Sequence, residues 1–140
     1  MSELQISIEG NSFIPSRIFC VGKNYDEHIK ELGGQVPEEP VVFMKPVTCI
    51  EVPFQTLYIP RHGKLLHHEV EVVLLIGKEG RDISELDALS HIAGATIGLD
   101  LTLRDVQGRL KKAGLPWEIS KSFEQSAPLG IFKSYDPDII

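Results

Sequence analysis

The stretch Leu65-Leu-His-His-Glu-Val-Glu-Val-Val-Leu-Leu-Ile-Gly77 is the most strand-like segment of the chain. It is rich in apolar and β-branched residues, and a glycine closes it. Because side chains alternate between the two faces of a strand, Glu69 and Glu71 are predicted to project from the same side. The neighbours predicted to point the other way, into a core, are Val70, Val72 and Leu74.

Glycines, prolines and capping residues divide the rest of the chain into short elements. The patterns predict strands over 17–22, 40–44, 65–77 and 93–101, and helices over 24–32, 84–92 and 102–113. Strands and helices do not alternate regularly, and the strands have an antiparallel character. The expected fold class is therefore α+β, mainly β, with a few short helices.

Two of the predicted helices have recognisable ends. Ser84 and Asp87 have capping-box spacing at the start of the second helix. Thr102 is predicted to cap the third helix, which Gly114 and Pro116 end. The apolar stripe of this third helix is formed by Leu103, Val106 and Leu110.

Composition restricts the classes of partner. The chain has 140 residues, enough for a single domain over 1–140, with 42% hydrophobic and 24% charged residues. Its formal net charge is -6 and it has no basic run, which argues against a nucleic-acid partner. The longest apolar run, Val72 to Ile76, is far too short to span a membrane. A small anionic substrate would need a locally positive site or a cation.

The N-terminus and the cysteines favour a cytoplasmic protein. Residues 1–10 contain acids and no base, unlike a signal or transit peptide. Cys20 and Cys49 form no CxxC pair and are expected to be reduced core thiols.

Three carboxylates form a candidate metal site. Glu69 and Glu71 repel each other unless a counter-charge neutralises them, and a divalent cation with oxygen ligands would do so. Asp100 ends an apolar strand where Thr102 already fits the cap, which leaves a third carboxylate available as a ligand. The alternative is a hydrated sheet face with solvated acids. The spacing leaves both interpretations open.

Two further groups could contribute to catalysis. His28 and Glu31 lie three residues apart on a predicted helix, as required for a histidine oriented by a carboxylate to activate water. The same residues also fit an exposed, charged helix face. Lys121 lies among bulky apolar residues, where a partly desolvated ammonium could pair with a substrate carboxylate or enolate. A surface lysine in a loop is the alternative.

Together these segments resemble the fumarylacetoacetate hydrolase family. The resemblance covers about residues 17 to 132, and its motifs occur in the family's order. They are Cys20-Val-Gly-Lys-Asn-Tyr25, Glu39-Pro-Val-Val-Phe-Met-Lys-Pro46, Leu66-His-His-Glu-Val-Glu71, Leu99-Asp-Leu-Thr-Leu-Arg-Asp-Val-Gln107 and Lys121-Ser-Phe123. The last two are similar to the acylpyruvase branch.

The resemblance implies a mixed, rolled β-sandwich with a few short helices that forms a homodimer. It also implies that family members continue for about a further third of their length, so that this domain is incomplete. The residues carried over are the metal ligands Glu69, Glu71 and Asp100 for Mg²⁺ or Mn²⁺, the water-activating pair His28 and Glu31, the substrate-facing Lys121, and the 2-oxo acid contacts Lys23 and Gln107.

The implied activity is metal-dependent hydrolysis or decarboxylation of small 2-oxo acids, with acylpyruvates and oxaloacetate as candidates. The substrate would bind the cation through its carboxylate and keto oxygens, and a pyruvate enolate would form as the carbon–carbon bond breaks. Two alternatives are an isomerase or decarboxylase of a catabolic 2-oxo diacid, and a non-catalytic, truncated metal-binding homologue. The glycines form no phosphate-binding loop, so no nucleotide cofactor is expected.

Overall fold

The computed structural model describes residues 4–22 and 39–137. The predicted helix over 24–32 lies outside these residues, as do Lys23, His28 and Glu31. The strands are β1 (Ile6–Ile8), β2 (Asn11–Phe13), β3 (Ile18–Gly22), β4 (Val41–Lys45), β5 (Ile50–Glu51), β6 (Leu66–Ile76), β7 (Ile92–Leu103), β8 (Ala127–Pro128) and β9 (Lys133–Ser134). The α-helices are α2 (Glu85–Ala88) and α3 (Arg104–Lys112), and the 3-10 helices are η1 (Val47–Cys49), η2 (Leu89–His91) and η3 (Glu118–Ser120).

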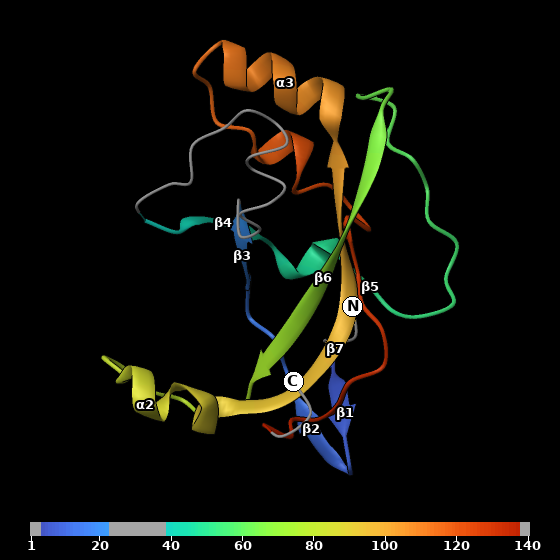
Figure 1. Ribbon diagram of the computed structural model, residues 1–140. Helices are drawn as coiled ribbons and strands as arrows, with labels where there is room; N and C mark the ends of the chain where they lie inside the picture. The colour runs from blue at the N-terminus through green and yellow to red at the C-terminus, as the bar shows by residue number, and fades with distance from the viewer. Residues whose placement is uncertain (1–3, 23–38, 138–140) are drawn as a thin grey trace.

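The long strands β6 and β7 form the centre of the fold. They pair antiparallel from Leu66↔Leu103 to Ile76↔Ile92, and β9 pairs with the other edge of β7. Figure 1 shows α2 at one end of β7 and α3 at the other. β1–β2 and β3–β4 are antiparallel pairs, whereas β5 and β8 pair in parallel. This mixed arrangement with few helices confirms the predicted fold class.

Strand β7 runs further than the sequence predicts, and Thr102 is not a helix cap. Thr102 is fully buried and pairs with His67, so the sheet ladder continues through Leu103. Helix α3 therefore begins at Arg104 without a side-chain cap. The backbone N–H of Arg104 donates instead to the carbonyl of Leu65, at 2.8 Å. Pairing with β6 extends β7 past Thr102, and this overrides the local capping pattern.

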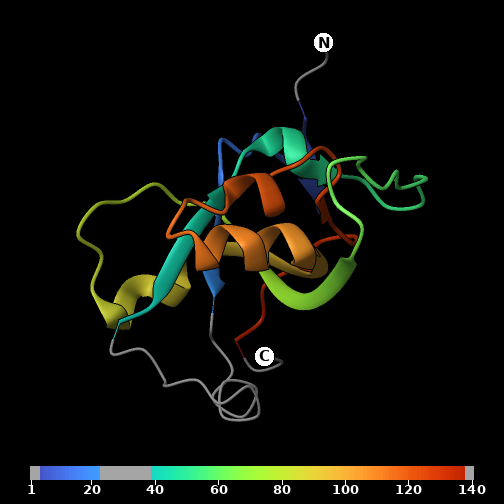
Figure 2. The same cartoon turned by 90° about the horizontal axis from the view of Figure 1, so that it is seen from above.

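Helix α3 packs on one of two small cores. Its predicted apolar stripe is confirmed as part of a cluster made of Leu101, Leu103, Val106, Leu110 and Phe123. The second cluster contains Ile8 of β1, Leu75 of β6 and Phe132. Figure 2 shows α3 and η3 side by side over one end of the sheet, so this end is the better covered.

The orientation of β6 is the reverse of the one expected. Val70, Val72 and Leu74 are exposed, at 58%, 54% and 43%, and do not enter a core. Glu69 and Glu71 share the inward face, by strand alternation, with the buried Leu75. Alternation defines two faces but not which one is covered, and here cationic side chains from other segments cover the acidic face.

The predicted cap of α2 and the predicted glycine at the end of α3 are both present in the structure. Ser84 caps α2, because its Oγ accepts a hydrogen bond from the Asp87 N–H at 3.2 Å. Gly114 follows α3 with a φ of 64°, as a glycine that ends a helix commonly does. Cys20 and Cys49 are both free thiols. Within the described ranges, no helix is long and apolar enough to cross a membrane.

Asp105 fixes the start of α3 to the segment before β6. Its carboxylate accepts hydrogen bonds from the N–H groups of Lys64 (3.0 Å) and Leu65 (3.3 Å). The Lys64 bond is the main reason that the pKa of Asp105 lies below its ordinary value. Arg104, the residue before Asp105, contacts the acidic cluster through Glu69.

We expect Asp105→Ala to lower the melting temperature near neutral pH. A carboxyl whose pKa is depressed in the folded state stabilises the fold at pH values above its unfolded-state pKa, which is close to 3.8 here. That contribution is lost as the pH falls through the folded-state pKa. The difference from wild type should therefore narrow in acid, as measured by thermal melts across pH. Glu124→Ala, at an exposed carboxylate, is the control. If the melting temperatures of wild type and Asp105→Ala differ by the same amount at every pH, the charge of Asp105 is not the source of the stabilisation.

Candidate active site

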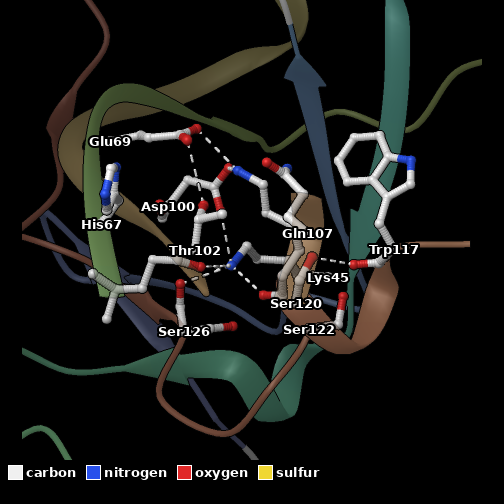
Figure 3. Close-up of polar contacts among 12 residues, drawn as sticks. Lys45, His67, Glu69, Asp100, Thr102, Gln107, Trp117, Ser120, Ser122 and Ser126 are labelled. Carbon is white, nitrogen blue, oxygen red and sulfur yellow. Dashed lines mark hydrogen bonds and ion pairs between the residues drawn. The ribbon is translucent and has the colours of Figure 1, made fainter. Parts of the chain in front are cut away.

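The acidic cluster lies where β6 and β7 pair. Glu69 stands directly opposite Asp100, and Glu71 stands opposite Gly98, two residues further along. The Asp100 side chain is 10% exposed and that of Glu69 is 31% exposed, so the cluster is covered at Asp100 and partly open at Glu69. Figure 3 shows both carboxylates from their neighbouring strands. The strand register thus brings together two of the three predicted metal ligands.

Lys121 joins these two carboxylates. It follows η3 directly, and its N–H bonds the Glu118 carbonyl at 2.9 Å. The side chain is 3% exposed, so Lys121 is not a surface lysine. Its Nζ donates to Glu69 Oε2 at 2.9 Å and also to Asp100 Oδ2. A buried ammonium therefore bridges the two acids.

Lys45, at the end of β4, is a second buried ammonium that the sequence analysis did not single out. It is 1% exposed, and its Nζ donates to the carbonyls of Lys121 (2.5 Å), Ser126 (2.8 Å) and Leu101 (3.3 Å) (Figure 3). It also lies 2.9 Å from Asp100 Oδ1. Burial holds the pKa of Lys45 below its ordinary value, although the Asp100 charge opposes this. Lys45 therefore fixes β7 and the segment 121–126 in one arrangement.

Arg104 is a further cation that the sequence analysis left unassigned. Its guanidinium pairs with Glu69 and donates to Gln107 Oε1 at 2.8 Å. Burial would raise the pKa of Glu69, but Lys121 and Arg104 outweigh it and hold that pKa below its ordinary value. Gln107 is buried on α3 and reaches the cluster through Arg104.

Cys20, on β3, lies near the same charges. Burial raises the pKa of its thiol to about 11, and the charge of Asp100 adds to this effect. The thiol is therefore protonated near neutral pH, which argues against a nucleophilic role.

The sequence model of the fumarylacetoacetate (FAA) hydrolase C-terminal family matches residues 17–138. The chain belongs to this family. It is 52% identical over 117 residues to the oxaloacetate tautomerase YcgM of Escherichia coli, covering 84% of this chain and 53% of that protein. The mitochondrial oxaloacetate tautomerase FAHD1 of Bos taurus is 43% identical over 115 residues, covering 82% of this chain and 52% of its own length.

A solved family structure agrees with the fold. The fumarylpyruvate hydrolase from Pseudomonas aeruginosa, solved in complex with Mn²⁺ and pyruvate, superposes with a TM-score of 0.85 at 37% identity. The match covers 96% of this chain and 60% of that one. The FAA hydrolase fold predicted from the motifs is confirmed. The chain spans about half the length of the curated relatives it matches.

The donor set of this FAA hydrolase domain suits a hard divalent cation. Glu69, Glu71 and Asp100 offer oxygen ligands from one face of paired strands. Asp100 Oδ1 is a buried acceptor without a hydrogen bond, despite its ion-pair distance from Lys45. Among residues 4–22 and 39–137, however, no three acidic, histidine or cysteine side chains are gathered closely enough to hold a metal ion. The residue types fit a cation, but the oxygens of Glu69 and Asp100 contact cationic side chains.

Lys45 and Arg104 could be found from sequence only in part. Arg104 lies in the motif over 99–107 and precedes Gln107 by three residues, so a position on the same helix face as Gln107 was the available signal. Lys45 precedes a proline at a strand end, where a surface lysine is the ordinary expectation. The contacts that identify it come from segments distant in the sequence.

Proposed function

We propose that this chain supplies the acidic centre of an enzyme that acts on small 2-oxo acids through a stabilised enolate. The observation that carries the proposal is the buried Lys121 ammonium between Glu69 and Asp100, beside Arg104. Such a site places positive charge where an enolate or carboxylate oxygen would lie. The names of the relatives, which act on oxaloacetate and fumarylpyruvate, support the same substrate class.

Glu69, Glu71 and Asp100 are proposed to hold one Mg²⁺ or Mn²⁺ ion. The relative solved with Mn²⁺ and pyruvate supports a divalent cation at such a site. When bound, the cation supplies a Lewis acid that polarises the keto group of the substrate. Lys121 donates to the oxygen that becomes negative as the enolate forms, and its burial strengthens that interaction.

The remaining proposed roles concern substrate binding and water. Lys23 and Gln107 are proposed to contact the 2-oxo acid, with Arg104 orienting Gln107 at 2.8 Å. His28 and Glu31 are proposed to activate water when the leaving group is an acyl unit. Decarboxylation of oxaloacetate releases CO₂ and needs no such water.

Oxaloacetate tautomerisation is a second candidate reaction. It passes through an enolate of oxaloacetate itself: a proton is exchanged between carbon 3 and the keto oxygen, and no carbon–carbon bond breaks. The 52% identity to a bacterial oxaloacetate tautomerase favours it. The alternative to an enzyme is a non-catalytic metal-binding protein. A further alternative is a chain whose site is completed by another segment.

Turnover by the purified chain tests the proposal. We expect Mg²⁺ or Mn²⁺ to support loss of the oxaloacetate enol, followed by its ultraviolet absorbance, and release of pyruvate from oxaloacetate or acetylpyruvate. Glu71→Gln should abolish both turnover and calorimetric cation binding, since it removes a ligand charge. Cation binding without turnover of any of these substrates would favour the non-catalytic alternative. Equal cation affinity in Glu71→Gln would remove Glu71 from the ligand set.

We also propose that the chain forms a homodimer in the cytoplasm. An exposed apolar face on the β3–β4 pair supports self-association, because soluble proteins seldom leave such patches uncovered. Its cross-strand pairs are Phe19 with Met44 and Val21 with Val42, all exposed. A symmetric two-fold contact is the commonest way to cover such a face.

Analytical ultracentrifugation at micromolar concentration should show a dimer for the wild-type chain. Met44→Glu places a charge in the apolar face and should shift the equilibrium to monomer. Leu86→Glu, at a 96% exposed residue of α2, is the matched control and should stay dimeric. A compact wild-type monomer that binds no hydrophobic dye would refute the dimer.

A further inference from the structure

Two short segments, 43–45 at the end of β4 and 121–123 after η3, contact each other beside the acidic cluster. The first reads Phe-Met-Lys and the second reads Lys-Ser-Phe, so each has a phenylalanine two residues from a lysine, in opposite order. The proposed function gives Lys121 a role and leaves both phenylalanines without one. The contacts between the two segments indicate what the rings do.

Each lysine lies over the ring of the other segment. Lys121 Nζ is 5.2 Å from the centroid of the Phe43 ring. Lys45 Nζ is 5.8 Å from the centroid of the Phe123 ring. Both distances are within the range of about 6 Å over which the face of an aromatic ring attracts a cation. The two segments therefore exchange a reciprocal pair of cation–π contacts.

Hydrogen bonds join the same two segments. Lys45 Nζ donates to the carbonyl of Lys121, and Ser122 Oγ donates to the carbonyl of Met44 at 3.0 Å. The contacts follow the order of the residues in both segments: 43 with 121, 44 with 122, and 45 with 123. Each lysine is thereby fixed relative to the ring of the other segment.

Phe43 is the ring that bears on the proposed chemistry, because it lies beneath Lys121. That lysine is 3% exposed, and a cation–π attraction is stronger where the cation is removed from water. Trp117 holds Phe43 in turn, with the two ring centroids 5.2 Å apart and an interplanar angle of 48°. A lysine stem is flexible, so a ring that is fixed by packing adds a constraint on the ammonium beyond its hydrogen bonds.

We propose that Phe43 is a positioning residue, which holds the Lys121 ammonium in place through the face of its ring. Phe43 acts through Lys121, whose charge stabilises a developing enolate oxygen only where it is correctly placed. An aliphatic side chain could fill the same space but has no electron-rich face. The catalytic consequence rests on the proposed function, whereas the contact between ring and ammonium does not.

Fluorination of single rings tests the contact with little change of shape. A trifluorinated phenylalanine withdraws electrons from the ring face and so weakens its attraction for a cation. At position 43 it should raise the equilibrium constant for urea unfolding by about 2–30-fold more than the same replacement at Phe132. Phe132 is the matched control, since it is buried in the second cluster with Ile8 and Leu75. Equal changes at 43 and 132 would overturn the inference.

Turnover shows whether the contact serves the reaction. Phe43→Leu has no ring face, so its kcat for oxaloacetate should fall by about 2–30-fold while KM stays close to the wild-type value. Phe43→Tyr keeps the ring face and should keep kcat close to wild type. Phe132→Leu removes a buried ring of the second cluster and should leave kcat unchanged. Equal losses in Phe43→Leu and Phe43→Tyr, or a loss confined to KM, would overturn the positioning role.

The two measurements separate the inference from the proposed function. If the wild-type chain turns over none of the substrates, the proposed function is rejected, and the fluorination comparison still decides whether the Phe43 ring holds the ammonium. The protein fluorinated at position 43 should also lose kcat, so the test stands even where Phe43→Leu does not fold. A fluorinated protein that is less stable but has the kcat of wild type would reject the positioning role.

Discussion

Replacing Lys45 by methionine is expected to lower the free energy of unfolding by about 3–5 kcal/mol, the usual cost of removing one partner of a buried ion pair. The ammonium is 1% exposed and lies 2.9 Å from Asp100 Oδ1. Its loss also leaves the carbonyls of Leu101, Lys121 and Ser126 without that donor. Urea unfolding followed by circular dichroism measures the change.

The same substitution at an exposed lysine provides the comparison. Lys112→Met should change the free energy of unfolding by less than about 0.5 kcal/mol, because surface substitutions seldom exceed that value. A Lys45→Met protein that is as stable as Lys112→Met would show that Lys45 does not hold β7 and the segment 121–126 together. Since whole domains are stable by only about 5–15 kcal/mol, the expected loss is a large fraction of the total.

The central strands and the family could be predicted from sequence for physical reasons. β6 has a long run of β-branched and apolar residues, and β7 continues as an apolar strand through Asp100. These local patterns survive in the structure because the two strands pair along their whole length. The motif order also predicted the FAA hydrolase fold, which the family match confirms.

The predictions that the structure contradicts concern features set by contacts between distant segments. Val70 and Val72 were predicted to be buried, but nothing local shows which face of β6 is covered. The acidic face is covered because Lys45 and Lys121 approach it from β4 and from the segment after η3. Thr102 failed as a cap for a similar reason, since pairing with His67 keeps it in the strand.

The sequence predicted which residues belong to the candidate site, but not which of them contact one another. Glu69, Asp100 and Lys121 do lie together. Their mutual ion pairing was not foreseen, because charge pairing across a sheet requires the register. The contacts of Lys121 with Glu69 and Asp100 therefore became visible only in three dimensions.

His28→Ala is expected to reduce acylpyruvate hydrolysis by about 10²–10⁴-fold, the range typical of lost general-base catalysis. Oxaloacetate decarboxylation should change far less, because that reaction needs no activated water. The measurement compares kcat for acetylpyruvate and for oxaloacetate with the same Mn²⁺-loaded protein. The selectivity between substrates, and not the loss itself, distinguishes water activation from a general disturbance of the site.

Two variants make that selectivity interpretable. Glu31→Gln should give the same pattern with a smaller loss, since the carboxylate orients and polarises the imidazole without accepting the proton from water. His68→Ala removes an exposed histidine on the opposite face of β6 from Glu69 and should affect neither reaction. Equal losses on acetylpyruvate and oxaloacetate in His28→Ala would mean that His28 and Glu31 shape the site for all substrates. Hydrolysis would then have to draw its base from another residue.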